Sequence, residues 1–317
     1  MITDPIFKSY KVLVGNVLGD AAYVSSSIAE PDTTRTVAPG QVEEAWVTGN
    51  TYAVDKRVIS GHRVYRNASA GVSDITPSAD PTRWSDEGPT NRWAWNDSQV
   101  STRTTYASPY VLTVKPGAIT HIGLAGLQDV ASVRVRMWDT PGGTLVHDQT
   151  YGNEDTQGVD PHWALYFNAP IYGYLKIIEG LPVYPGCQVE VTLAGYAAKV
   201  SVGLIAFGTV ETAGAAEVGA ELSIRDYGYT TTDKWGNAIR TPGAKGADLK
   251  VSGKLPVEQA NALRQVLMRL VDVGAIHIPS SRPEYAWLTT WGILKPATLR
   301  AESTQIVGID FEVEGFI

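Results

Sequence analysis

The sequence predicts a mainly β protein: a small aromatic β module, then an antiparallel β-sandwich of jelly-roll type, then a small α+β domain with one helix on an antiparallel sheet. Three observations support this prediction. Tryptophans cluster in a turn-rich segment near residue 90, short β-branched segments follow up to about residue 210, and helical spacing of apolar residues occurs near residue 260. The chain has 317 residues, which is enough for two or three domains.

Residues 1–40 form the first predicted element, an N-terminal strand or arm. The segment KVLVGNVL (residues 11–18) is apolar and β-branched, and the polar stretch after it closes with the turn signal Pro39-Gly40. A lone strand needs a pairing partner. The sequence leaves open whether that partner lies further along this chain or in a neighbouring subunit.

Residues 41–97 form the predicted aromatic module. Within residues 82–97, Trp84, Trp93 and Trp95 stand among Gly, Pro, Asn and Asp. A large indole in such a segment is either part of the core of a minimal fold or an exposed binding surface. The two alternatives imply different functions.

Residues 98–210 are predicted to form the β-sandwich. In the segment 131–143, Val133, Val135 and Met137 alternate with Arg134 and Arg136, which is the period of a strand with one buried face. Further strands are expected at 110–117, 119–127, 145–151, 172–180, 187–195 and 199–208. Closely spaced strands separated by turn signals are typical of an antiparallel sandwich.

Residues 211–317 are predicted to form the α+β domain, after a linker of small residues at 209–221. Its helix lies in LPVEQANALRQVLMRLVDVG (255–274), with Pro256 in the first turn and Gly274 just after the last turn. One apolar face is expected to consist of Val257, Ala260, Leu263, Leu267, Leu270 and Val273. Strands are predicted on both sides of the helix, at 247–253, 285–295 and 303–317.

Composition excludes several classes of function. The net charge is −7 and Lys and Arg do not cluster, which argues against binding to nucleic acid. No run of about 18 apolar residues predicts a membrane span, and the N-terminus lacks a secretory signal, so we expect synthesis in the cytoplasm. Cys187 is the single cysteine and is expected to be a buried thiol.

Motifs of catalysis are missing from the sequence. It has no G-x-S-x-G elbow, no phosphate-binding glycine loop and no H-E-x-x-H, and its five histidines are widely separated. His147-Asp148 and the acidic segment 153–160 are expected to be solvated loop residues rather than a calcium loop. We therefore predict no catalytic residue, no metal and no cofactor. The alternative is a glycosidase whose carboxylates, such as Asp139, Asp155 and Asp160, converge in space.

The aromatic module resembles the small chitin-binding-type carbohydrate-binding modules of families five and twelve. The residues that carry the resemblance follow in the family's order: Ala45-Trp46, Tyr52, Val58, Gly61, Val64-Tyr65, Pro77, Trp84 and Gly88. The module is too small for an aliphatic core. Its core is therefore predicted to consist of a few larger side chains: Tyr52, Val58, Val64, Tyr65 and Trp84.

The resemblance implies sugar binding by exposed aromatic side chains, and here the sequence departs from the family. Several members carry an aromatic pair where this chain reads YRNASAG (residues 65–71). Trp46, Trp93 and Trp95 are the candidates to replace that surface. The competing expectation is that Trp84 belongs to the module core and that Trp93 and Trp95 lie at the junction with the sandwich.

A second resemblance extends over more of the chain. GPTNRWAWND (88–97) is similar to a T-N-R-W-A-[MW]-[FN]-D element of virion proteins of tailed bacteriophages. SIRDYGYTTTDKWGN (223–237), the helical segment and the closing IDFEVEGFI (309–317) are similar to C-terminal motifs of that group. The resemblance implies a tail protein of the baseplate, tail tip or adsorption apparatus, located in the virion and made in the cytoplasm of the bacterial host.

Three functional hypotheses follow from these observations. The first is a non-enzymatic tail subunit that forms a homo-oligomer, a trimer or hexamer, and assembles with other phage tail proteins. The second is a receptor-binding protein that contacts host surface glycans through the aromatic module. The third is a polysaccharide-degrading enzyme. In the first, the other tryptophans (Trp138, Trp163, Trp235, Trp287 and Trp291) are expected to be mostly core or interface residues.

Overall fold

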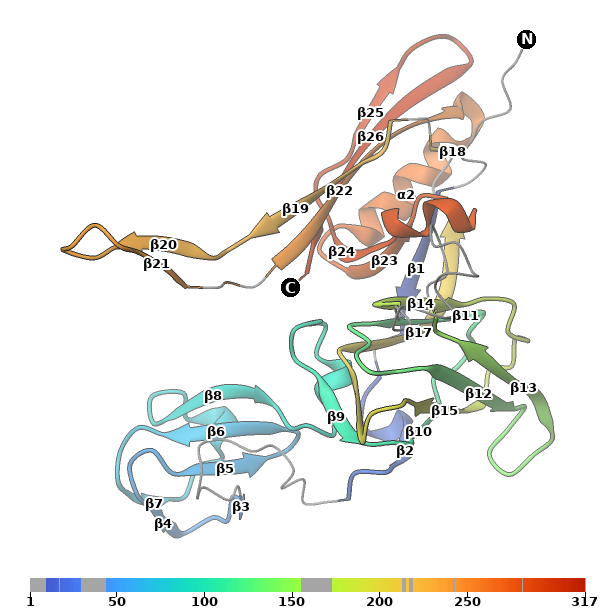
Figure 1. Cartoon of the computed structure of the whole chain (residues 1–317). Coiled ribbons are helices and arrows are strands. Elements are labelled where there is room, and N and C mark those ends of the chain that lie inside the picture. The colour runs from blue at the N-terminus through green and yellow to red at the C-terminus, as the bar shows by residue number, and fades with distance from the viewer. Residues whose placement is uncertain are drawn as a thin grey trace, which may run out of the picture.

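The computed structural model describes residues 10–16, 18–29, 44–154, 173–212, 215–216, 219–241, 243, 245–280 and 282–316. Within these ranges the chain is mainly β and holds one α-helix, α2 (Ala260–Leu270). Figure 1 shows the small module at one side, the sandwich beside it, the C-terminal sheet with its helix above, and a long hairpin that projects away from the body. The predicted fold class is confirmed.

The module occupies residues 44–89 and is built from very short strands. Four of them form a sheet in the order β3-β5-β6-β8, and two more form the pair β4-β7. Their bounds are β3 (Glu44–Ala45), β4 (Asn50–Tyr52), β5 (Arg57–Ser60), β6 (Arg63–Asn67), β7 (Gly71–Ser73) and β8 (Trp84–Pro89), with a 3-10 turn η2 (Pro77–Ala79). A second 3-10 turn, η3 (Ala94–Asn96), follows the module and leads into the sandwich.

Two sheets face each other in the sandwich. One has the order β13-β12-β15-β10-β2, and the other is formed by β14, β11 and β17 at the end of an 11-stranded sheet. The bounds are η1 (Asp20–Ala22), β2 (Tyr23–Ser26), β9 (Thr104–Ala107), β10 (Tyr110–Val114), β11 (His121–Ala125), β12 (Ser132–Trp138), β13 (Leu145–Gly152), β14 (Leu175–Ile178), β15 (Gln188–Ala194), β16 (Lys199–Val202) and β17 (Leu204–Thr212). Strands β9 and β16 form a separate pair.

The alternation seen in the sequence sets the sandwich core. Val133, Val135 and Met137 of β12 are fully buried and pack with Ile122 and Phe207 of the facing sheet in one cluster. Each such side chain stabilises the fold by about 1.5–3 kcal/mol relative to its exposed state. Cys187 is buried in the same cluster, as predicted, and its thiol donates to the carbonyl of Gly117 at 3.1 Å.

The N-terminal strand β1 (Lys11–Gly15) pairs within this chain. It lies between β17 and β23 (Gly274–Ile278) and is antiparallel to both. Val12 packs in the C-terminal core and Leu13 in the cluster between the two halves, because successive side chains of a strand point to opposite faces. The sandwich and the C-terminal domain therefore share one continuous sheet, and β17 runs into the predicted linker as far as Thr212.

The C-terminal half contains the rest of that sheet, in the order β23-β24-β26-β22-β18, with β19 and β25 also paired to it. The bounds are β18 (Ala215–Ala216), β19 (Glu221–Asp226), β20 (Tyr229–Thr232), β21 (Ala238–Thr241), β22 (Lys245–Pro256), η4 (Val257–Gln259), η5 (Pro283–Leu288), β24 (Thr290–Leu294), β25 (Thr298–Ala301) and β26 (Ile306–Gly315). The strand predicted at 285–295 therefore begins only at Thr290, after the 3-10 turn η5.

Helix α2 packs on this sheet through Leu263, Leu267 and Leu270, all of which are buried. The predicted helix was too long at both ends. Val257 lies in η4 and Val273 lies beyond the helix, and both are exposed. The helix ends because Val271 adopts an extended conformation, so Gly274 begins β23 and is not a helix cap.

The projecting hairpin, which we call the arm, comprises the described residues of 219–241 and the part of β22 that pairs with β19 (245–250). Its base is the pair β19–β22 and its outer part is the pair β20–β21. Every residue of β20 and β21 is exposed. Figure 1 shows that the outer part extends away from both the sheet and the sandwich.

Candidate functional site

The module holds its aromatic side chains in one small core. Tyr52, Val58, Tyr65 and Trp84 form a buried cluster, and Val64 is also buried. The rings of Tyr52 and Trp84 meet edge to face, with centroids 5.4 Å apart. This is the burial that a module without an aliphatic core requires.

Trp46 lies at the edge of that core and is half-buried. Its Nε1 donates to the hydroxyl of Ser73 at 3.2 Å, and the Nε1 of Trp84 donates to the same hydroxyl at 3.3 Å. Ser73 therefore fixes both indoles. Trp46 keeps part of its surface accessible while its orientation is set.

The segment YRNASAG (65–71), which lacks the aromatic pair of several chitin-binding-type modules, contains a buried polar residue. Asn67 is fully buried, and its Nδ2 donates to the carbonyls of Ala53 at 2.8 Å and Tyr52 at 3.2 Å. Its Oδ1 accepts from Nε of Arg83 at 3.0 Å. Asn67 thus braces the module, and this position supplies no stacking surface.

Trp93 and Trp95 lie at the junction between the module and the sandwich. They are only 7% and 1% exposed. Trp93 stacks on His62 of the module with ring centroids 3.9 Å apart and lies 5.1 Å from Tyr23 of β2. Trp95 meets Phe207 of the sandwich edge to face. Neither indole presents a face on which a sugar ring can stack in this structure.

Further contacts fix this junction. Nε of Arg92 donates to the hydroxyl of Tyr23 at 2.8 Å, and the Arg92 guanidinium lies 4.5 Å from the centre of the Tyr23 ring. Nε2 of His62 lies 2.6 Å from a carboxylate oxygen of Asp20. The module is therefore held against the body by stacked rings and charged groups rather than by a free linker.

The remaining tryptophans were expected to be mostly core or interface residues, and two of them lie outside the core of the chain. Trp291 is buried, and its Nε1 donates to the carbonyl of Ser98 at 3.0 Å. Trp235 is 77% exposed and Trp287 is 57% exposed. Trp138 is half-buried on β12, and Trp163 lies outside the described residues.

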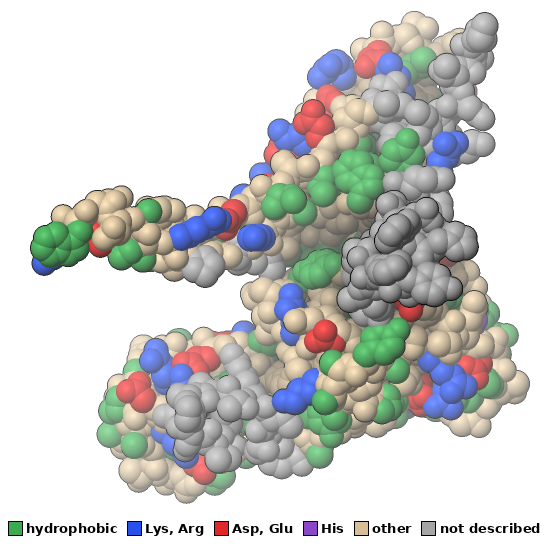
Figure 2. Space-filling model, in the orientation of Figure 1, with side chains coloured by type: hydrophobic (Ala, Val, Ile, Leu, Met, Phe, Trp, Pro, Cys, Tyr) green, Lys and Arg blue, Asp and Glu red, His purple; other side chains and the backbone are tan. Residues whose placement is uncertain are grey.

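The arm ends in a well-formed turn. The carboxylate of Asp233 accepts from the backbone N–H groups of Trp235 and Asn237, both at 2.8 Å, and the Asn237 bonds lower the pKa of Asp233. Nζ of Lys234 lies 4.9 Å from the centre of the Trp235 ring. Figure 2 shows hydrophobic side chains at the free end of the arm, next to a cationic one. The turn residues D-K-W-G-N were a signal in the sequence that this indole stands at a loop tip.

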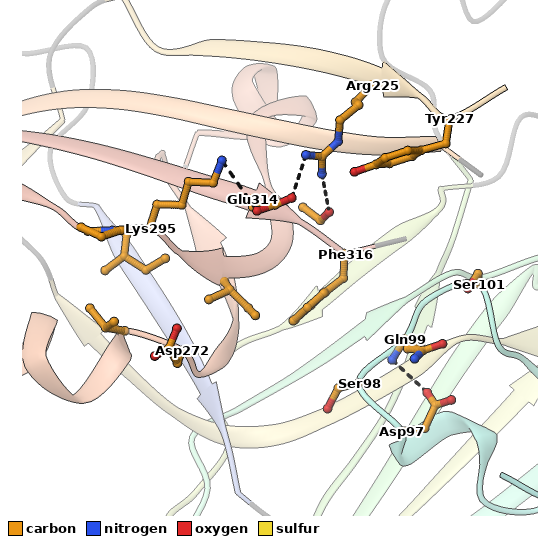
Figure 3. A pocket seen from close by; sticks show the side chains of 15 residues that line it. Asp97, Ser98, Gln99, Ser101, Arg225, Tyr227, Asp272, Lys295, Glu314 and Phe316 are labelled. Atoms are coloured by element: carbon orange, nitrogen blue, oxygen red, sulfur yellow. Dashed lines mark hydrogen bonds and ion pairs between the residues drawn. The ribbon is translucent and has the colours of Figure 1, made fainter. Parts of the chain in front are cut away.

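At the base of the arm lies a hollow of about 910 Å³, which we call the root hollow. It is bounded by the loop after η3, the end of β19, the residues after α2, and the ends of β24 and β26 (Figure 3). Tyr227 and Phe316 contribute aromatic surface to it, and Ser98, Gln99 and Ser101 contribute polar groups. None of these residues was predicted as part of a site, because the hollow joins the loop at 97–101 to segments more than a hundred residues later in the sequence.

The cations of the root hollow are paired. Arg225 contacts Glu314 at 2.7 Å and Asp248 at 3.1 Å, and Nζ of Lys295 lies 3.6 Å from Glu314. The hydrogen bond from Arg225, and then the charge of Lys295, lower the pKa of Glu314. Glu314 is thus ionised at neutral pH and unsuited to donate a proton.

Two carboxylates of the root hollow differ from this pattern. Asp97 and Asp272 form no ion pair within the described part of the chain. Burial raises the pKa of Asp97, and the Gln99 backbone bond and the charge of Arg63 offset only part of that effect. The hollow therefore combines carboxylates that have no ion-pair partner among the described residues with aromatic surface, which suits a cationic and aromatic ligand.

A smaller apolar groove of about 300 Å³ adjoins the root hollow, and Phe316 lines both. Its wall includes Leu222 and Ile224 of the arm base, together with Tyr174 and Trp287, which are both largely exposed. A contiguous exposed apolar patch is a common mark of an interaction site.

The remaining candidates give little support to catalysis. Asp139 accepts from the backbone N–H groups of Thr140 and Thr144, so its carboxylate closes its own turn, and Asp155 and Asp160 lie outside the described residues. Among the residues that are described, no group of three or more His, Cys, Asp or Glu side chains is arranged to hold a metal ion. Across the same residues, no helix has the length and apolar character needed to cross a membrane.

No protein-family model matches the chain, and no curated protein matches it. Part of the chain is similar to CpGH89CBM32-5 from Clostridium perfringens, solved in complex with GalNAc-β-1,3-galactose. The identity is 13%, the match covers 38% of this chain and 84% of that one, and the TM-score is 0.27. The family 32 carbohydrate-binding module of C. perfringens NanJ, solved with galactose, matches at 13% identity over 37% of this chain and 82% of that one, with a TM-score of 0.25. At these TM-scores, neither the fold nor the ligand of those modules is carried over to this chain.

Proposed function

We propose that this protein is a non-enzymatic structural subunit of a tailed-bacteriophage tail and that it assembles through its arm into a homo-oligomer. The single observation that carries this proposal is the arm itself. An isolated two-stranded hairpin is marginally stable in water, yet here one projects from the body with every residue of β20 and β21 exposed. Assembly supplies the surface that such a hairpin needs.

The two faces of the arm are unequal, which supports docking. Side chains of paired residues share a face, so Tyr229 and Thr231 lie on the same side as Ile239, whereas Thr230 lies with Arg240 on the other. One face is thus partly apolar and the other is polar. A sheet with that pattern ordinarily packs its apolar face against another layer, and no described segment of this chain covers it.

The rigid junction between the module and the sandwich also supports a structural role for the protein. Stacked rings around Trp93 fix the module relative to the sandwich, so the module can act as a docking or decoration domain in a fixed position. The placement in a phage tail rests on the sequence resemblance of residues 88–97 and of the C-terminal motifs, and other tail proteins are the partners that it implies.

Glycan binding is the second candidate function, and one observation favours it. Of the three tryptophans predicted to contact sugar, Trp46 is the one that is only half-buried. A single stacking residue gives weak binding, which several copies in an oligomer would strengthen through avidity. This function adds a receptor-binding role to the structural one and does not compete with it.

The mass of the protein in solution tests the primary proposal. Light scattering after size exclusion is expected to give a trimer or hexamer for the full chain. A variant in which residues 227–243 are replaced by an Asn-Gly turn is expected to be a folded monomer. A monomeric full chain at all concentrations contradicts assembly through the arm. Release of reducing ends from chitin oligosaccharides or bacterial surface polysaccharide contradicts the non-enzymatic part.

A further inference from the structure

We propose that the tip of the arm binds in the root hollow of a second copy of this chain, with the ammonium of Lys234 beside the carboxylate of Asp97 and the indole of Trp235 against Tyr227 and Phe316. This inference rests on the proposed function, because it names the partner and the acceptor site of the arm. It makes each copy both a donor and an acceptor of one contact.

The occupant of the hollow must come from another molecule. At about 3.3 Å per residue, the stretch from Asp226 to the start of the turn at Asp233 extends about 23 Å from its root. Tyr227 lines the hollow at that root, so the tip of the same arm lies far from it. The outer strands are paired along their length, from Tyr229 with Thr241 to Thr232 with Ala238, and a paired hairpin does not fold back on itself.

Charge complementarity selects the tip as the occupant. Lys234 forms no ion pair with a described residue, and its Nζ lies 4.9 Å from the centre of the Trp235 ring. Asp97 has no cationic partner within ion-pair distance in that same part of the chain, although it is partly removed from water. Figure 3 shows Asp97 beside Gln99 at one side of the hollow, the paired Arg225 and Glu314 at the other, and Phe316 between them. The adjacent Lys234 and Trp235 complement the hollow, because the ammonium can pair with the carboxylate of Asp97 and the indole can pack on Phe316.

The area available is consistent with such a contact. A buried aromatic side chain contributes about 150–250 Å², and Trp235 and Tyr229 are 77% and 60% exposed. Together they supply roughly a third of the about 800 Å² that each partner buries in a standard interface. The flanks of the arm and the exposed groove beside the hollow, with Trp287 and Tyr174, can supply the rest.

The geometry has a consequence for symmetry. A tip on one copy and a hollow on the next form a heterologous contact, unless two copies exchange arms reciprocally. Heterologous contacts close into a ring when the rotation between copies is a whole fraction of a turn. In a closed ring each arm tip is bound in the root hollow of the next copy, and no tip or hollow is left unoccupied. A trimer or hexamer with this contact has that arrangement.

A double-mutant cycle tests the ion pair. Association is measured for the full chain, for Lys234→Ala, for Asp97→Asn, which keeps an acceptor for the Gln99 N–H, and for the double variant. Each single change is expected to weaken association about threefold or more, and the double variant to be no weaker than the worse single one. Lys199→Ala, on β16, is the matched control and is expected to change nothing. Independent effects of Lys234→Ala and Asp97→Asn would overturn the pairing.

A cross-link between copies tests the position directly. Lys234→Cys and Ser101→Cys variants are mixed under oxidising conditions, and a disulfide-linked dimer of the two is expected, whereas Lys199→Cys with Ser101→Cys gives none. Cys187 is buried and does not compete. If the full chain forms an oligomer but neither cross-link nor coupling appears, the root hollow is not the acceptor and the proposed function stands. If the full chain is a monomer at every concentration, both proposals fail.

Discussion

Replacing His277 by glutamine is predicted to make the stability of this protein less sensitive to mild acid. His277 lies on β23, is fully buried, and its Nδ1 is 2.6 Å from the hydroxyl of Tyr10. The ring of Tyr10 stacks on Phe311 of β26, with centroids 5.0 Å apart. The imidazole therefore lies where the N-terminal segment meets the C-terminal sheet, in surroundings that disfavour a charge.

The size of the effect follows from linkage. Burial lowers the pKa of His277 from 6.5 to about 3. Below pH 6.5 the unfolded chain takes up a proton that the folded protein does not accept, so the free energy of unfolding falls as the pH falls from 6.5 towards 3. Each pH unit costs about 1.4 kcal/mol, so about 3 kcal/mol is lost between pH 7.5 and pH 4.5. Above pH 6.5 the effect vanishes, because both states are neutral.

Urea unfolding, followed by circular dichroism, gives the free energy of unfolding at pH 7.5 and at pH 4.5. The change between the two pH values is then compared between the unmodified chain and the variant. The full chain is expected to lose about 3 kcal/mol more on acidification than His277→Gln, whatever the stability of that variant at pH 7.5. His147→Gln, which removes a half-buried imidazole from β13, is the control and is expected to behave like the unmodified chain. Equal losses for the unmodified chain and His277→Gln would refute the idea that burial keeps this imidazole neutral.

Three further predictions follow from the packing. Trp95→Ala is expected to lower the free energy of unfolding by about 3–5 kcal/mol, whereas Met268→Ala, on the exposed side of α2, changes it by less than about 0.5 kcal/mol; chemical denaturation compares the two. Gly208→Ala places a Cβ 1.8 Å from the carbonyl oxygen of Val14, so β1 and β17 must separate, and a loss of about 1–3 kcal/mol or more is expected in the same assay. If the module binds glycan, Trp46→Ala is expected to abolish retention on chitin oligosaccharides, whereas Trp138→Ala, which removes a half-buried indole from β12 outside the module, is retained normally; equal retention of both would exclude Trp46.

Helix α2 shows how far local sequence reaches. Leu263, Leu267 and Leu270 recur at the spacing of one helical face, and that face is buried on the sheet. The same spacing extends to Val257 and Val273, which are exposed. The apolar periodicity extends past the ends of helix α2, because the point at which a helix ends depends on the backbone conformation of single residues. Here that residue is Val271, which is extended.

The tryptophans show where composition stops being informative. Both Trp235 and Trp291 are large apolar side chains with strand residues nearby, yet one stands at the tip of the arm and the other is buried between the two halves of the chain. Hydrophobicity favours burial only where a second surface is available. Whether that surface exists depends on segments distant in the sequence, or on another molecule.

By itself the sequence determined most strands of the sandwich, several turns, the face of the helix and the aromatic skeleton of the module, because periods of two and of 3.6 residues and the conformations of turn residues are local properties. The tertiary structure decided which strands are neighbours. Lys11 pairs with Ile278 and Thr212, and this register joins the sandwich and the C-terminal domain into one sheet. It also decided the burial of Trp93 and Trp95, the projection of the arm and the existence of the root hollow. A periodic pattern states that a face will be buried but not what buries it, since that choice rests on contacts between residues hundreds of positions apart.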